Sequence, residues 1–329
     1  MTILAAVYPS LVTKPKRGLL AFLATVVVAL LVLASAQLLG LATDGTGVAA
    51  TPADSGPSAA APETPTSSPT RSSAPPRSLD FVLSSFNVLG SSHTEPGGGK
   101  RASMPSGQTR IRWAARLLAR HGVDVVGFQE FQLDQQRAFL RVTGAQYDIY
   151  PGFDLGGRGS NNSIAWRTDT WDLMESDTID IPYFDGKPWP MPVVLLRNRD
   201  TGLRAYFTNF HNPASTASHP NQGRWRRLAA AREVALVNRL TRQTDYPVLL
   251  TGDLNEREIA FCTMTGRADM TAANGGSHDG ACRPPDQIGI DWIFGSAGVR
   301  FSNYRADRSA LVNRTTDHPM IVSRVRIEG

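Results

Sequence analysis

The sequence has few cysteines, few lysines and few long hydrophobic runs. Two cysteines in 329 residues exclude a small scaffold held together by many disulfides. The composition, with 29 glycines and 22 prolines, is that of neither a coiled coil nor a collagen-like chain. Only one apolar run is long enough to cross a membrane, which excludes a polytopic membrane protein. The chain is therefore expected to carry a globular domain.

Several common catalytic signatures are also absent. The sequence contains no Gly-x-Ser-x-Gly motif, so a serine hydrolase built on a nucleophile elbow is not expected. It contains no Walker-type loop, which disfavours a P-loop nucleotidase. The histidines and cysteines do not have the spacing of a zinc site.

The first 42 residues have the pattern of an export or anchoring signal. Residues 19–42 contain no charged side chain, and as a helix they would cross a bilayer core of about 30 Å. They follow a basic stub, residues 1–18, which is expected to stay in the cytoplasm while the rest of the chain is exported. Residues 34–36 (Ala-Ser-Ala) also form a cleavage site. The run is either an uncleaved transmembrane anchor or a signal peptide cleaved near Ala36, and both predict an extracytoplasmic protein.

Residues 43–78 are almost entirely Ala, Pro, Ser, Thr and Gly. A segment without large apolar side chains cannot form a core, so it is predicted to be a disordered linker. Residues 79–329 remain for one globular domain, which is long enough to bury a large core without covalent staples.

Cys262 and Cys282 are the only cysteines. In an exported domain an even pair indicates one disulfide, which would stabilise the fold by roughly 3 kcal/mol through loop closure. A metal site is the weaker alternative, because two thiols at this spacing lack further ligands. Two free buried thiols are the remaining alternative.

The net charge of +5 is shared unequally along the chain. Lys14, Lys16 and Arg17 contribute three of these charges, and beyond residue 78 lysine occurs only at positions 100 and 187. The other basic residues there are arginines, whose guanidinium groups match phosphate oxygens. A general preference for arginine codons accounts for the same composition, so the charge favours a phosphate-bearing partner only slightly.

The hydrophobic pattern predicts an α/β domain with mixed sheets, because strands and helices alternate irregularly and two stretches resemble hairpins. Helices are expected at 109–121, 133–142 and 222–240. Strands are expected at 79–88, 123–129, 147–150, 163–167, 171–181, 193–198, 203–209, 246–251, 289–294, 299–304 and 320–326.

Polar residues stand at the ends of these apolar strands. They are Asn87, Glu130, His211, Asp253, Asn255, Asp291, Asp317 and His318. Strand ends of α/β folds line ligand crevices. Carboxylate and amide oxygens suit a hard cation such as Mg²⁺, and histidines add proton transfer or phosphate contacts. Singly, each residue has an ordinary explanation: Asp253 would also cap a helix at 256–261, and Asp317 would also form a turn.

The order of the motifs is more specific than any single residue. The series Ser-Phe-Asn-Val (85–88), Gln-Glu (129–130), Asn-Phe-His (209–211), Gly-Asp-Leu-Asn (252–255), Ile-Asp-Trp-Ile (290–293) and Thr-Asp-His-Pro (316–319) resembles the endonuclease/exonuclease/phosphatase superfamily. Asn-Asn-Ser-Ile (161–164) is also similar to a strand of that family. These motifs span nearly all of residues 79–329.

The resemblance implies a four-layer α/β sandwich of two packed mixed sheets flanked by helices, and a metal-dependent hydrolase acting on phosphoester bonds. Glu130 would be the main Mg²⁺ ligand, with Asn87 and Asp317 close to the metal; Mn²⁺ is an alternative ion. Asp253, helped by Asn255, would orient or deprotonate the attacking water. His318, paired with Asp291, would act as base or hold the phosphate.

By the same resemblance, His211 would contact the phosphoryl oxygens or serve the leaving group, although the sequence shows no carboxylate partner for it. The loop after Asn87 can also bring His93 to the site. Leu89 and Phe210 depart from the pattern of the DNA-repair branch, where an acidic residue and a threonine are usual.

The substrate is expected to be nucleic acid, and the domain to be monomeric. The alternative is a lipid head group, as in sphingomyelinases, or a small phosphate. Residues 181–192 carry the aromatic side chains for a loop that touches a membrane, although covering a sheet edge is the favoured explanation for them. A non-catalytic binding module is disfavoured, because every expected catalytic position is filled.

Overall fold

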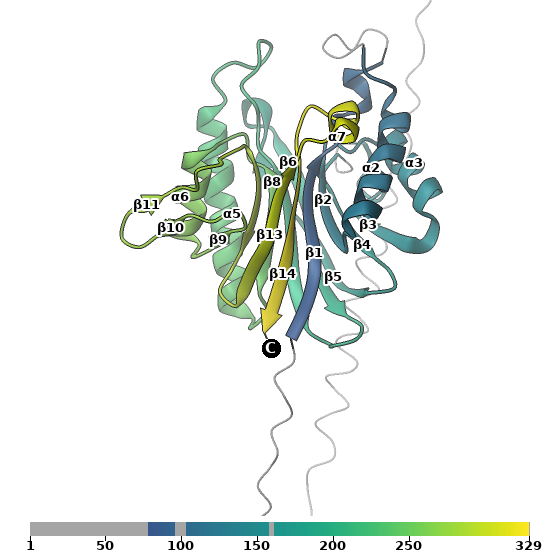
Figure 1. Ribbon diagram of the computed structural model, residues 1–329. Helices are drawn as coiled ribbons and strands as arrows, with labels where there is room; N and C mark the ends of the chain where they lie inside the picture. Colours follow the sequence, from purple (N-terminus) through teal and green to yellow (C-terminus); the bar gives the residue numbers. More distant parts are fainter. Residues whose placement is uncertain (1–77, 96–102, 158–160, 329) are drawn as a thin grey trace, which may run out of the picture. The chain divides into compact units, whose positions relative to one another are not determined.

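The computed structural model describes residues 78–95, 103–157 and 161–328 (Figure 1). The predicted stub, apolar run and linker lie outside these ranges, apart from Ser78, which begins the first strand. None of the helices in the described ranges combines the length and the hydropathy that a membrane crossing requires.

Two six-stranded sheets form the centre of the domain. The first has the order β13 (Val299–Asp307), β14 (Met320–Glu328), β1 (Ser78–Asn87), β2 (Val125–Gln129), β4 (Ser163–Arg167) and β3 (Tyr147–Tyr150). The second has the order β5 (Trp171–Pro182), β6 (Pro188–Asn198), β7 (Arg204–His211), β8 (Val248–Asp253), β12 (Asp291–Gly295) and β9 (Thr271–Ala272). β1 pairs in parallel with β2, and β7 with β8, while the other pairs are antiparallel. The predicted mixed sheets are therefore confirmed.

The sheets pack face to face, and helices cover their outer faces (Figure 1). Aromatic side chains fill the space between the sheets, and the rings of Phe81 and Trp171 lie 5.1 Å apart. α2 (Gly107–His121) and α3 (Leu133–Thr143) pack on the first sheet. α5 (Gly223–Gln243) and α6 (Glu258–Arg267) pack on the second. This is the predicted order of helix, sheet, sheet and helix.

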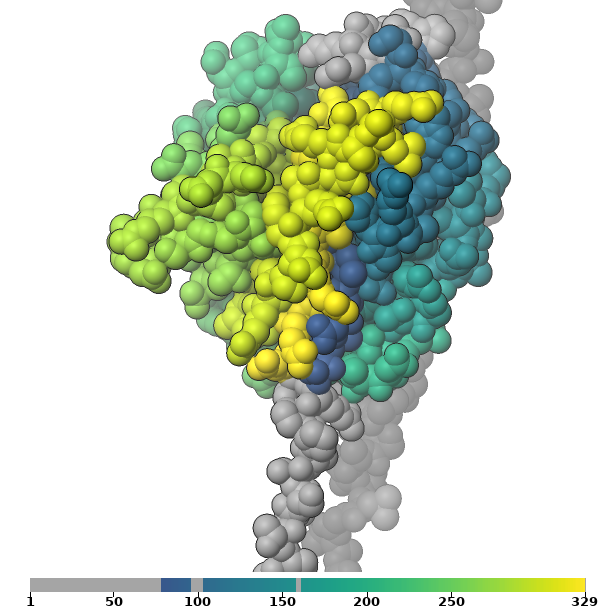
Figure 2. All heavy atoms as spheres, viewed as in Figure 1, coloured from purple at the N-terminus to yellow at the C-terminus, as the bar shows by residue number. Residues whose placement is uncertain are grey.

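The two ends of the described domain lie next to each other in one sheet. Ser78 pairs with Glu328 at the start of the β1–β14 ladder, so the first and last strands run side by side (Figures 1 and 2). On the face shown in Figure 2, the C-terminal segment lies between the earlier and the middle parts of the chain. The sequence motifs near the two ends of the domain are thereby brought onto neighbouring strands.

The start and end of α2 agree with the sequence pattern. The Ser106 hydroxyl accepts a hydrogen bond from the Thr109 N–H and so caps the first turn. Gly122 adopts a φ of 60°, a left-handed conformation that glycine takes without steric cost, and ends the helix. The helix buries Ile111, Leu117 and Leu118 against the first sheet.

The predicted start of β6 is wrong, and α7 and several two-residue strands were not predicted. β6 begins at Pro188 rather than at 193, and its first part pairs only with β5. Prolines at 188, 190 and 192 do not prevent this pairing, because on a segment with one neighbour their missing N–H groups leave no ladder bond unmade. α7 (Ala310–Thr315) was missed, because six residues are too few to show a helical period.

Cys262 and Cys282 form the predicted disulfide, with their Cα atoms 5.5 Å apart. It joins α6 to a small hairpin made of β10 (Ser277–His278) and β11 (Cys282–Arg283). A loop of 20 residues is thus closed on the outer side of the second sheet.

We expect the Cys262→Ala/Cys282→Ala double variant to lose about 3 kcal/mol of unfolding free energy, because the unfolded chain regains the entropy of the open loop. Urea unfolding of the oxidised protein and of the variant measures this difference. As a control, a reducing agent should destabilise the wild type by the same amount and leave the variant unchanged. Equal stabilities of the oxidised wild type and the variant would refute this role of the disulfide.

Candidate functional site

Four of the predicted residues meet because their strands end at the same edge of the two sheets. Asn87 ends β1, and Glu130 follows β2, its parallel neighbour in the first sheet. His211 ends β7 and lies beside Asp253 in the parallel β7–β8 ladder of the second sheet. The carboxyl ends of parallel strands form one rim, as Asn87 and Asp253 show by a hydrogen bond across the sheets.

Two further residues reach the same rim from strands that begin there. Asp291 is the first residue of β12 and is the antiparallel partner of Asp253. His318 lies in the turn before β14, which runs next to β1. A strand that runs antiparallel to its neighbour begins at the edge where that neighbour ends. The pairing of β12 with β8 and of β14 with β1 therefore brings Asp291 and His318 to this rim.

The Asp253 carboxylate is the centre of the site. Its Oδ2 atom accepts a hydrogen bond from the Asn87 amide at 3.1 Å, and its Oδ1 atom accepts one from the Asn255 N–H at 3.1 Å. The Nε2 atoms of His211 and His318 lie 3.6 and 3.7 Å from Oδ2. One buried carboxylate therefore faces two imidazole rings.

His318 is held by a second carboxylate. Its Nδ1 atom lies 3.0 and 3.1 Å from the two carboxylate oxygens of Asp291. Burial acts to lower the pKa of His318, but Asp291, helped by Asp253 and Asp317, outweighs it and raises the pKa to about 10. Burial also raises the pKa of the Asp291 carboxyl, and His318 opposes this. At neutral pH the pair is an imidazolium next to a carboxylate.

Glu130 is surrounded by hydrogen-bond donors. Its Oε1 atom accepts from the Asn87 amide at 3.1 Å, and its Oε2 atom accepts from the Gly90 N–H at 2.9 Å. The Nε2 atom of His93 lies 3.2 Å from Oε2, as expected for the loop after Asn87. Burial acts to raise the pKa of Glu130, but His93, His211 and the donors keep it well below its ordinary range.

The ionised carboxylate of Glu130 at the rim of the sheets fits a divalent cation. The other two predicted ligands differ in their surroundings. Asn87 donates from its amide nitrogen to both Glu130 and Asp253, while its Oδ1 accepts from the Leu89 N–H. Asp317 is exposed on the turn before β14. Carboxylate and amide oxygens are metal ligands that match Mg²⁺ rather than a soft metal.

A second acidic group is compact enough to hold an ion. Ligand atoms of Asp253, Asp291 and His318 all lie within 4.8 Å of one another. The imidazolium of His318 already supplies positive charge between these two carboxylates, so a cation here would have to displace its proton.

Left-handed backbone conformations mark the same rim. Leu89, Glu130 and Asn255 have φ values of 54°, 56° and 50°, although none is a glycine. Each lies one or two residues after the end of β1, β2 or β8. Such conformations cost about 1–3 kcal/mol each and persist where the surroundings enforce them, as at functional sites. They turn the chain sharply, so that the Glu130 side chain and the Asn255 N–H point to the site.

Asn255 was predicted to help Asp253, but its side chain points elsewhere. Its side-chain amide donates to the Asn212 carbonyl oxygen at 2.8 Å, and only its backbone N–H contacts Asp253. The side chain thus positions the segment after β7.

Sequence reasoning missed Tyr183, whose hydroxyl lies 3.4 Å from the Nδ1 atom of His211. Tyr183, rather than a carboxylate, is therefore the second partner of that imidazole. Burial and the nearby carboxylates of Glu130 and Asp253 raise the pKa of Tyr183, which keeps the phenol neutral. The aromatic segment 181–192 was the available signal, but it was interpreted as a surface feature.

A pocket of about 440 Å³ opens beside Glu130 and His211. Its lining includes aromatic rings from two segments. Tyr183, Phe184 and Trp189 come from the β5–β6 hairpin, and His219 comes from the loop before α5. The Phe184 and His219 rings are stacked 4.4 Å apart. Residues 181–192 thus form a hairpin whose rings line the site.

Arg110 is the second residue that sequence reasoning missed. It is fully buried in α2, and its guanidinium donates to the carbonyl oxygens of Val88 at 2.6 Å and Thr315 at 3.0 Å. It therefore ties the loop after β1 to the turn that carries Asp317 and His318. Its place on the apolar face of the helix, next to Ile111, was the only signal.

The sequence of residues 84–318 matches the Endonuclease/Exonuclease/phosphatase family. No curated protein matches the chain.

Solved structures with the same fold cover most of the chain at low identity. A family protein from Bacteroides thetaiotaomicron is 18% identical with a TM-score of 0.58, over 77% of this chain and 97% of its own. A mannosyl-6-phosphatase from the same species is 17% identical with a TM-score of 0.55, over 74% and 99%. The human Nocturnin catalytic domain, solved with a bound sulfate anion, is 14% identical with a TM-score of 0.58, over 77% and 98%.

We expect the Asp291→Asn variant to lower the pKa of His318 by about two units or more, because the main group that holds the proton is removed while burial still opposes the charge. NMR titration of the imidazole in metal-free buffer measures the pKa. The wild-type ring should stay protonated through pH 9. Asp80→Asn, which removes the partner of Arg326 at the far end of β14, serves as a control and should leave His318 unchanged. Identical titration curves of His318 in the wild type and Asp291→Asn would contradict the assignment.

Proposed function

The chain belongs to the endonuclease/exonuclease/phosphatase family of phosphoester hydrolases, and we propose that it is an exported, Mg²⁺-dependent phosphodiesterase that cleaves nucleic acid. One observation carries this proposal. The Asp253 carboxylate faces the His211 and His318 imidazoles at 3.6 and 3.7 Å, and it shares the Asn87 amide with Glu130. A base, two imidazoles and a cation ligand are thus assembled around one space.

In the proposed mechanism Asp253 orients the attacking water and receives its proton. The hydrogen bonds from Asn87 and the Asn255 N–H fix the carboxylate, so its lone pairs point in defined directions. General-base catalysis of this kind contributes about 10²–10⁴-fold to the rate. Asp253 is buried, which keeps competing water away from it.

The imidazoles stabilise the charge that builds up on the phosphoryl group. His318 is protonated at neutral pH, and its Nε2–H points to the side where Asp253 lies. Preorganised positive charge in a partly dehydrated site is worth more than the same charge in water. His211, steadied by the Tyr183 hydroxyl, would contact a phosphoryl oxygen or the leaving group.

The proposal assigns the cation to Glu130, together with Asn87 and Asp317. When bound, Mg²⁺, or Mn²⁺ in its place, would supply further positive charge for the phosphoryl oxygens. His93 lies against the same Glu130 oxygen and has to yield or share this position.

The aromatic lining of the pocket supports a nucleic acid substrate. Flat rings beside a phosphodiester site offer surfaces on which bases stack, and each stacked base contributes about 1–3 kcal/mol. Lys187 lies in the same lining and adds positive charge for the substrate backbone.

Export is part of the proposal because of three features. Residues 1–42 have the pattern of an anchor or signal peptide, and residues 43–78 the composition of a spacer. The disulfide between Cys262 and Cys282 is typical of an oxidising compartment.

We expect the purified protein with Mg²⁺ to cleave plasmid DNA and oligonucleotides, and Asp253→Asn to lower kcat by about 10²–10⁴-fold because the general base is lost. Gel assays and initial rates on bis-p-nitrophenyl phosphate measure both. Asp80→Asn, at the end of β1 opposite Asn87, is the matched control and should keep wild-type rates. If nucleic acid stays intact while sphingomyelin or a sugar phosphate is cleaved in an Asp253-dependent way, the protein is a hydrolase but nucleic acid is not its substrate.

Phe184→Ala should raise the KM for single-stranded oligonucleotides about tenfold and leave kcat unchanged, since a stacking surface is lost while the catalytic groups remain. Leu228→Ala, an exposed apolar residue on α5, is the control. An unchanged KM in Phe184→Ala would show that bases do not stack on this wall.

A further inference from the structure

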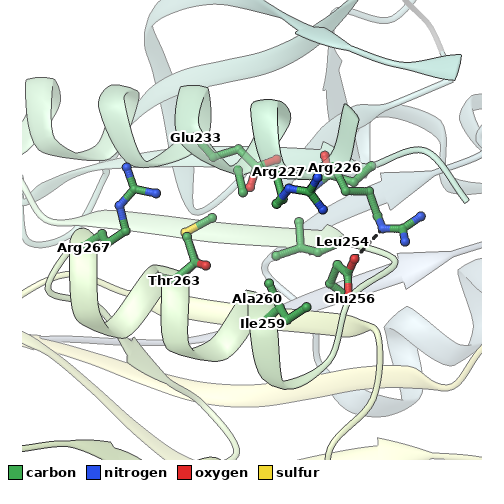
Figure 3. A pocket seen from close by; sticks show the side chains of 12 residues that line it. Arg226, Arg227, Glu233, Leu254, Glu256, Ile259, Ala260, Thr263 and Arg267 are labelled. Atoms are coloured by element: carbon green, nitrogen blue, oxygen red, sulfur yellow. Dashed lines mark hydrogen bonds and ion pairs between the residues drawn. The ribbon is translucent and has the colours of Figure 1, made fainter. Parts of the chain in front are cut away.

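A second pocket, of about 150 Å³, lies between α5 and α6 (Figure 3). Its apolar walls include Leu254, Ala260 and Met264. Its polar lining includes Asn212 and Glu233. None of the catalytic side chains described above lines it, so it is a separate site.

Glu233 is a buried acid, and in the pocket lining that the structure describes the Asn212 side chain is the only polar neighbour close enough to influence it. It sits in the middle of α5 and has no solvent exposure. Among the described residues, neither of its carboxylate oxygens accepts a hydrogen bond of normal geometry. The Oδ1 atom of Asn212 in the same pocket is also buried and unpartnered among these residues. Native proteins rarely leave buried acceptors unpaired, so these three oxygens offer a place for a hydrogen-bond donor.

The rim of the pocket carries two arginines that are free to bind an anion. Arg227 and Arg267 are exposed, and neither forms an ion pair within the part of the chain that the structure describes. Arg226 differs, since it is committed to Glu256 at 2.6 Å and to the Pro213 carbonyl oxygen at 2.9 Å. Figure 3 shows this ion pair at one end of the pocket and Arg267 at the other.

We propose that this pocket binds a small zwitterion, whose primary ammonium group pairs with Glu233 and Asn212 and whose carboxylate or phosphate pairs with Arg227 and Arg267. A simple cation would be repelled by the arginines at the entrance, and a simple anion would bring no donor for the Glu233 and Asn212 oxygens. A molecule with both charges satisfies both sets. A cavity of about 150 Å³ accommodates a compound the size of benzene, about six non-hydrogen atoms.

The protonation state of Glu233 agrees with this assignment. Burial raises the pKa of Glu233 to about 8, and the Asn212 side chain offsets only part of this. The charged groups that line the pocket besides Glu233 are Arg226, Arg227, Glu256 and Arg267. An ammonium group favours the ionised acid, so binding at pH 7 should release up to one proton per ligand.

The pocket adjoins the catalytic site through Asn212. The N–H of this residue donates to the Asp253 carbonyl oxygen at 2.9 Å, and its own carbonyl oxygen accepts from Asn255. A ligand that contacts the Asn212 side chain thus touches the segment that follows His211.

Isothermal titration of the full-length protein at pH 7 tests the proposal. The probes are β-alanine and phosphoethanolamine, and the controls with a single charge are ethanolamine and propionate. We expect at least one zwitterion to bind ten times more tightly than both controls and to release protons. Tighter binding of β-alanine points to a carboxylate ligand, and tighter binding of phosphoethanolamine to a phosphate.

The variants Glu233→Gln and Arg227→Gln should each weaken this binding at least tenfold. Arg239→Gln, on an exposed part of α5 outside the pocket, should not. Arg227 is exposed, so its variant remains informative even if Glu233→Gln fails to fold. The absence of zwitterion binding by the wild type, or equal binding by wild type and Arg227→Gln, would overturn the proposal.

Discussion

The amide group of Asn209 connects the two sheets at the edge where the catalytic residues meet. From β7 in the second sheet, its nitrogen donates to the carbonyl oxygens of Phe128 at 2.7 Å and Ser163 at 3.2 Å in the first sheet. Its oxygen accepts from the Gln129 amide at 2.6 Å and from the Thr251 hydroxyl at 3.1 Å. Every polar atom of this buried side chain is paired, so the sheets have one defined alignment. Gly127 makes room for it, because a Cβ atom there would lie 2.6 Å from the Asn209 oxygen. Glu130, one residue after Gln129, then faces His211 and Asp253 from the opposite sheet.

In the resulting site, the carboxylates of Glu130, Asp253 and Asp291 each lie next to an imidazole or a hydrogen-bond donor, so no two of them face each other uncompensated. Glu130 is flanked by donors and by His93, and Asp253 and Asp291 flank the imidazolium of His318. Uncompensated buried carboxylates would take up protons, whereas the pairing keeps Glu130 ionised and His318 charged. The left-handed residues after β1, β2 and β8 and the buried guanidinium of Arg110 hold these groups in place. The cost of that strain and burial is offset by the packed cores on both sides of each sheet.

Much of this arrangement could be predicted from the sequence. Buried strands appear in it as apolar runs, and the polar residues of the site stand where these runs end. β3 and β4 have the expected bounds, and the ordered motifs placed Asn87, Glu130, Asp253 and His318 on strand ends. Three features could not be predicted. Tyr183 depends on how the β5–β6 turn folds back over β7, and Arg110 has a charge that argues against the burial it has. Glu233 looks like an ordinary helix residue until α6 packs over it. Each depends on contacts between segments far apart in the chain, which local patterns do not encode.

The central claim is that the aligned sheets position a water molecule for attack on phosphorus. Hydrolysis of bis-p-nitrophenyl phosphate in oxygen-18 water with Mg²⁺ tests it most directly, with mass spectrometry of both products. We predict the label in p-nitrophenyl phosphate, none in p-nitrophenol, and formation of the labelled product about 10²–10⁴ times more slowly by Asp253→Asn. Label in p-nitrophenol, or equal rates of labelled-product formation by wild type and Asp253→Asn, would contradict this.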